Sequence, residues 1–206
     1  MSSFFRFLLV GVLVLLPFSL CSQDKALYQR AEAGSASAQT ELALWYMSQG
    51  MYKEGEVWLK KAAKQGNAVA QFNLGVSYFN QHNDKEALKM WKKAADQNHP
   101  LAQARLGEYA AQKGNTKEAD KWYVLAARQG VPQAQYYVGN SYAARKDYTN
   151  AVAWWTKAAK AGYPQAEYNL AIHYLNNGDA AKAREWCIKA VEHGFPGAGE
   201  LLNKIN

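Results

Sequence analysis

The sequence has little of several residue types, and each shortage excludes a class of protein. Its 206 residues include two cysteines, too few for a fold held by disulfide bonds. No apolar run reaches the roughly 20 residues that span a bilayer, and the mean hydropathy of −0.41 excludes several membrane spans. The four histidines lack a second histidine, a cysteine or an acid at metal-site spacing: His82, His99, His173 and His193.

Motifs for catalysis and for nucleic-acid binding are also missing. The sequence has no strand pattern, so no glycine-rich phosphate loop can follow a strand, and it has no paired Ser/Lys or Ser/His motif. We therefore expect no catalytic residue, no cofactor and no metal, and no nucleic-acid partner. Cys187 lies in a column of packing residues and is expected to be a buried, inert thiol.

Residues 1–22 differ from the rest and are predicted to be a secretory signal peptide. A single charge, Arg6, precedes ten apolar or glycine residues that end at Pro17. Two processing routes remain open. A cut before Ser22 would release a soluble exported form, whereas acylation of Cys21, in a sequence similar to a lipobox, would give a lipoprotein. A third reading, an uncleaved anchor, is also left open.

The remaining chain repeats every 32 residues, starting with a column of alanines. Counted from each alanine, the positions 4, 5 and 8 residues later hold an aliphatic residue, a small residue and mostly tyrosine, all on one side of a helix. The alanines are Ala38, Ala70, Ala102, Ala134, Ala166 and Ala198.

A second helix in each unit carries its own columns of tryptophan and alanine. Small residues in register allow close approach of helices, and the large aromatic residues fill the space between them. A glycine or asparagine follows this helix, where a left-handed conformation is needed, and a proline opens the next helix in most units. The tryptophan column is Trp58, Met90, Trp122, Trp154 and Trp186, and the column after it is Leu59, Trp91, Tyr123, Trp155 and Cys187.

These columns predict one continuous all-α domain over residues 23–206, made of about eleven antiparallel helices. A half unit at 23–36 and a closing helix at 197–206 flank five helix pairs. The predicted repeats are 37–68, 69–100, 101–132, 133–164 and 165–196.

The repeat resembles the Sel-1-like family, a relative of tetratricopeptide repeats. The segments that carry the resemblance are Ala70–Gln97 and Ala166–Gly194, with the pattern Ala-x-x-x-Leu-Gly-x-x-Tyr before a loop and Lys-Ala-x-x-Trp-x-x-Lys-Ala-Ala-x-x-Gly after it. The resemblance implies a right-handed α-solenoid that binds other proteins. The loops here are shorter than usual in the family and the unit is 32 residues instead of 36 or more, so the curvature need not follow the family.

The resemblance also implies a non-catalytic scaffold or adaptor in the bacterial cell envelope, working as a monomer on a protein partner. We expect it in the periplasm, soluble or lipid-anchored, or secreted; the two specific roles considered are an immunity protein that neutralises a toxin and an envelope-assembly factor. The alternatives are a penicillin-interacting, hydrolase-like protein and a membrane-surface lipoprotein with a basic outer face. The paired cysteines of the penicillin-linked branch are missing here.

The columns that vary between units predict where a partner binds. On the first helix of each unit, positions 2, 3, 6, 9 and 10 after the alanine point roughly away from the packing side. Phe72, Tyr136 and Tyr168, at position 2, are expected to pack against the next unit. The predicted partner-binding residues are Glu41, Asn73, Arg105, Glu108, Tyr137, Asn140, Asn169 and Asn176.

Overall fold

The structure, a computed structural model, describes residues 22–205. The expected signal segment up to residue 21, including the acylation candidate Cys21, lies outside the described residues. No helix in the described part of the chain is both long enough and apolar enough to cross a membrane.

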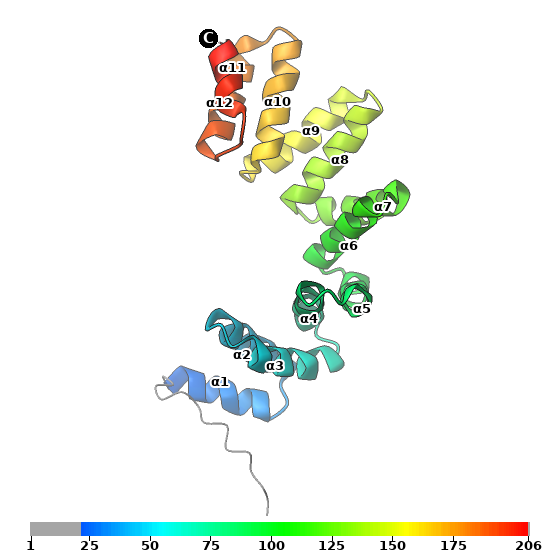
Figure 1. Ribbon diagram of the computed structural model, residues 1–206, viewed down its shortest axis with the longest axis vertical. Coiled ribbons are helices and arrows are strands. Elements are labelled where there is room, and N and C mark those ends of the chain that lie inside the picture. The colour runs from blue at the N-terminus through cyan, green and yellow to red at the C-terminus, as the bar shows by residue number, and fades with distance from the viewer. Residues whose placement is uncertain (1–21, 206) are drawn as a thin grey trace, which may run out of the picture.

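The described residues form twelve helices, one more than the number predicted (Figure 1). A single helix, five helix pairs and a last helix are present as expected, and these parts together make twelve rather than eleven. The helices are α1 (Ser22–Glu32), α2 (Ala36–Ser48), α3 (Tyr52–Lys64), α4 (Ala68–Asn80), α5 (Asp84–Asp96), α6 (Pro100–Gln112), α7 (Thr116–Arg128), α8 (Pro132–Ala144), α9 (Tyr148–Lys160), α10 (Pro164–Asn176), α11 (Ala180–Glu192) and α12 (Ala198–Ile205).

The helix ends follow from local chemistry. Side chains that accept a hydrogen bond from the first turn cap most helices; Asn67, for example, accepts from the Ala70 N–H at 2.9 Å. The turn after each second helix has a positive φ, and Asn98 adopts it with φ of 62° where the other units have glycine. A second set of such turns, after the first helices, includes Lys146 with φ of 63°.

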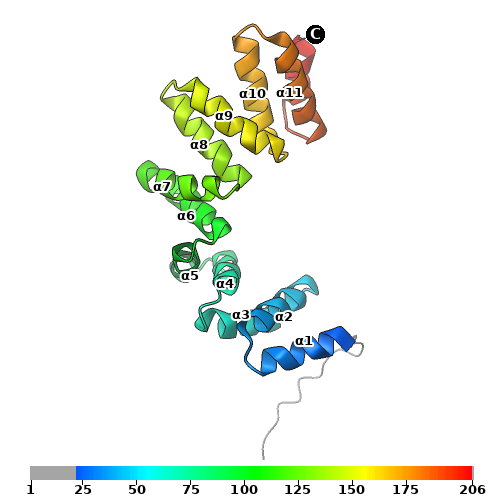
Figure 2. The ribbon, with the colours of Figure 1, turned by 180° about the vertical axis from the view of Figure 1, so that it is seen from behind.

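Each helix packs mainly against its neighbours in sequence, so the chain forms an elongated, curving stack with α1 at one end and α12 at the other (Figures 1 and 2). The alanine columns lie between the helices and are almost fully buried. A Cβ atom on Gly107 would lie 2.9 Å from the Tyr123 ring, which shows why a small residue recurs there. The column from Leu59 to Cys187 is buried throughout, whereas Trp154 and Trp186 are only half-buried.

Candidate functional site

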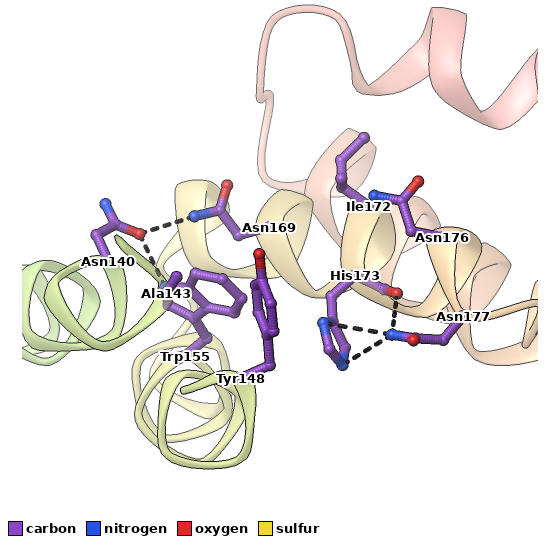
Figure 3. Close-up of a pocket in the computed structure, with 9 residues that line it drawn as sticks. All are labelled: Asn140, Ala143, Tyr148, Trp155, Asn169, Ile172, His173, Asn176 and Asn177. Carbon is purple, nitrogen blue, oxygen red and sulfur yellow. Dashed lines mark hydrogen bonds between the residues drawn. The ribbon is translucent and has the colours of Figure 1, made fainter. Parts of the chain in front are cut away.

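The largest cluster of predicted site residues lines a pocket between α8, α9 and α10 (Figure 3). Asn140 comes from α8, and Asn169 and Asn176 come from α10. The cavity has a volume of about 610 Å³. Its other lining residues are Ala143, Tyr148, Trp155, Ile172, His173 and Asn177.

A short hydrogen-bond network fixes one wall of this pocket. The Asn140 Oδ1 atom accepts a hydrogen bond from the Trp155 Nε1–H and another from the Asn169 Nδ2–H, both at 2.9 Å (Figure 3). Among the residues that the structure describes, the Asn140 amide nitrogen, the Asn169 carbonyl oxygen and the whole Asn176 amide have no hydrogen-bond partner. Donors and acceptors are therefore available to a ligand.

The opposite wall is aromatic and carries the pocket's only titratable ring. The Tyr148 ring stands between Trp155 and His173, with its centroid 5.7 Å from that of His173 (Figure 3). The Asn177 Nδ2 atom donates to the His173 carbonyl oxygen at 2.8 Å and lies 3.2 Å from the ring Nε2. The lining contains no acid, lysine or arginine. The pocket therefore suits a neutral ligand that forms hydrogen bonds.

An equivalent pocket lies three repeats earlier, between α2, α3 and α4, with a volume of about 390 Å³. Each of its lining residues has a counterpart 96 residues later in the first pocket. Asn73, a predicted site residue, corresponds to Asn169. The lining residues are Met47, Tyr52, Asn73, Val76, Ser77, Asn80 and Gln81.

The two corresponding places between these pockets are closed. At the first, Arg105 and Glu108 form an ion pair at 2.8 Å across a cavity of only about 40 Å³. At the second, the Tyr137 ring stacks on Tyr123 with centroids 4.0 Å apart. Three predicted site residues thus fill space in the structure, and their side chains are already engaged with their own chain.

Glu41 lies apart from every pocket described above and faces Arg30 at 3.4 Å on the surface. The expectation that position 2 packs against the next unit is confirmed for all three aromatics. The pairs are Phe72 with His99 at 4.8 Å, Tyr136 with Tyr163 at 5.3 Å and Tyr168 with Phe195 at 4.6 Å between ring centroids.

The sequence analysis missed Tyr52 and Tyr148, which begin α3 and α9 and line the two open pockets. It also missed a column of buried polar residues. Gln39, Gln71, Gln103 and Gln135 each donate to a backbone carbonyl eight residues earlier, and Glu167 takes the fifth place. Both features recur at the repeat spacing, and comparing units position by position would have found them.

The remaining reactive groups outside the pockets are buried or isolated. Cys187 is fully buried, as predicted, and its Sγ donates to the Ala198 carbonyl oxygen at 3.1 Å. Burial raises the pKa of this thiol, which lowers its reactivity. Among residues 22–205, no three histidine, cysteine or acidic side chains lie close enough to hold a metal ion.

Two solved structures resemble this chain in both sequence and fold. A Sel1 repeat protein from Oxalobacter formigenes is 28% identical with a TM-score of 0.77, over 87% of this chain and 58% of its own. The second, c5321, is described as a protective antigen present in uropathogenic Escherichia coli strains; it is 30% identical with a TM-score of 0.78, over 88% of this chain and 43% of its own. The present chain thus spans about half the length of these relatives.

YrrB, described as a TPR protein with an unusual peptide-binding site, shares the fold at 19% identity and a TM-score of 0.56, over 87% of this chain and 98% of its own. No curated protein matches the chain. The Sel1 repeat model matches residues 36–67, 68–99, 100–131, 132–163 and 164–195, one residue earlier than each predicted unit. Together these matches cover most of the sequence, and the chain belongs to the Sel1 repeat family, with a tetratricopeptide-like helical fold.

Proposed function

We propose that this protein is a non-catalytic scaffold that holds an extended segment of a partner polypeptide along the face lined by the two open pockets. One observation carries the proposal: the Asn169 oxygen and the Asn176 amide face the larger pocket without a partner in the described structure. An extended peptide offers alternating N–H and C=O groups, and an asparagine side chain complements both.

The surroundings of these amides favour a peptide over a reaction. Tyr148, half exposed beside them, offers a rigid apolar surface of the kind that anchors partner residues. The neutral lining places no nucleophile next to an activating base. The peptide-binding site ascribed to YrrB is consistent with this use of the fold, although the low identity relates the two chains by fold alone.

The scaffold works in the bacterial cell envelope, after export through the N-terminal segment. Support comes from Arg6, the apolar run and the small residues that precede Ser22. Its role is either to neutralise a toxin or to assist envelope assembly, and an adjacent toxin gene or envelope-synthesis gene would distinguish these. Intact-mass measurement of soluble and membrane fractions tests processing: a first residue of Ser22 excludes acylation at Cys21.

Peptide binding can be tested with a random peptide library selected on the chain, followed by anisotropy titration of the selected peptides. Asn169→Ala with Asn176→Ala is expected to weaken binding about tenfold or more, because each lost hydrogen bond contributes roughly 1 kcal/mol. Lys85→Ala with Lys117→Ala, exposed on α5 and α7, is the matched control and should change little. Peptides that bind both variants equally well would contradict the proposal.

A further inference from the structure

The four equivalent places between successive repeats fall into two kinds, open at both ends of the series and closed in the middle. The open places are the pockets of about 390 and 610 Å³ that contain Asn73 and Asn169. The closed places contain Arg105, in an ion pair with Glu108, and Tyr137, stacked on Tyr123.

Three separate columns change together between the open and closed places. At position 3 of the first helix, the open pockets have asparagine where the closed ones have Arg105 and Tyr137. At position 10, the open pockets have Asn80 and Asn176, where the closed ones have Gln112 and Ala144. This joint change separates the two pockets from ordinary variation between units.

The third column is the first residue of the second helix. It is Tyr52 and Tyr148 at the open pockets, and Asp84 and Thr116 at the closed places. The two tyrosines are 68% and 50% exposed, although large aromatic residues are usually buried in such a repeat. A single packing rule repeated along the chain would not produce this pattern.

The chemistry of the two pockets is matched. Each combines one exposed tyrosine, two asparagines and one aliphatic residue, Val76 or Ile172, and neither lining contains a charged side chain. Asn80 and Asn176 have no hydrogen-bond partner among the described residues. An ionised anchor residue would lose its hydration without gaining an opposite charge, which is costly.

From this pattern we infer that the two pockets are paired subsites for a single polypeptide segment that carries two uncharged, amide- or hydroxyl-bearing anchor residues. One anchor enters each pocket, and the stretch between them crosses the closed middle without inserting a side chain. This rests on the proposed peptide-binding function and adds to it the number, spacing and chemistry of the anchors. Two linked weak contacts then act as one strong contact.

The test uses peptides of about 24 residues, which reach at most roughly 80 Å when extended, selected from a random library on the full chain. Two variants replace each exposed tyrosine with the residue that the chain itself uses at a closed place: Tyr52→Asp and Tyr148→Thr. Because both tyrosines are exposed, the fold should survive, and circular dichroism verifies this. Leu101→Thr, which changes a residue that is 48% exposed and lines neither pocket, is the matched control.

Each tyrosine variant is expected to weaken a selected peptide by at least about tenfold, and the control should have no effect. Half-peptides that carry one anchor should bind about 100-fold more weakly than the whole peptide, because the two contacts no longer reinforce each other. Each half-peptide should respond to only one of the two tyrosine variants. Replacing either anchor with glutamate should abolish its contribution.

Peptides that respond to one tyrosine variant and not to the other would overturn the paired subsites and leave the proposed function standing. Dependence on acidic or basic anchors would overturn the inferred chemistry in the same way. If no selected peptide responds to any pocket residue, both the paired subsites and the proposed function are wrong.

Discussion

His99 caps α6 through a ring nitrogen, which makes the cap depend on pH. Its Nδ1 atom accepts a hydrogen bond from the Ala102 N–H at 3.3 Å, and its ring stacks on Phe72. Only an unprotonated Nδ1 can accept, and a positive charge at a helix N-terminus is unfavourable. Burial also lowers the pKa of His99 from its ordinary value of 6.5.

The free energy of unfolding should therefore fall as the pH drops through 6.5 towards the lowered pKa. The sign follows because the unfolded chain, with the ordinary pKa, binds the proton first. His99→Asn copies the cap used one unit earlier by Asn67 and should flatten this part of the profile. Chemical denaturation at several pH values measures it; an unchanged slope in His99→Asn, or an equal flattening in His82→Asn, would contradict the assignment.

Glu167 and His193 replace a neutral pair that three earlier units share. In those units a glutamine Nε2–H donates to the buried glutamine at 2.8 Å, as Gln129 does to Gln103. In the last unit, the His193 Nδ1 atom lies 2.9 Å from a carboxylate oxygen of Glu167, whose side chain is 1% exposed. A buried carboxylate tolerates the loss of its partner less well than a buried amide does.

His193→Ala should therefore destabilise the fold more than the matched Gln129→Ala does, by about 1–3 kcal/mol. Glu167→Gln introduced together with His193→Gln rebuilds the neutral pair and should recover most of the loss. Thermal or denaturant unfolding of the four proteins gives the comparison. Equal losses in the two single variants would show that the charge of Glu167 has no added cost.

At the scale of the helix, stability depends on the small residues that let paired helices approach. A Cβ atom on Gly107 would lie within about 3 Å of three Tyr123 ring atoms, whereas one on Gly199 in α12 would meet nothing within 4 Å. Gly107→Ala should destabilise the protein by about 1–3 kcal/mol because α6 and α7 must separate. Gly199→Ala should instead stabilise it by up to about 1 kcal/mol through helix propensity. Denaturant unfolding distinguishes them, and losses of similar size would contradict the packing argument.

The fold could be predicted from the sequence because each packing position is repeated. The alanine column and the glycine or asparagine turns identify the helix pairs, and the structure places them as expected. The site was harder to predict because a variable position has no repeated partner to show its environment. Nothing in the sequence reveals that Arg105 pairs with Glu108 or that Tyr137 stacks on Tyr123, since these contacts depend on how the units are arranged in space.

The whole molecule has contacts mainly between successive helices, so a defect should remain local. Leu170 in α10 is fully buried, and Leu170→Ala should cost about 2–5 kcal/mol. In a stack of nearest neighbours, this loss is expected to accelerate amide hydrogen exchange in α9, α10 and α11 much more than in α2 and α3. The matched change at the other end, Leu42→Ala in α2, should give the reverse pattern. Uniform acceleration along the chain in either variant would show instead that the repeats unfold as one cooperative unit, and the two open pockets could then not be perturbed separately.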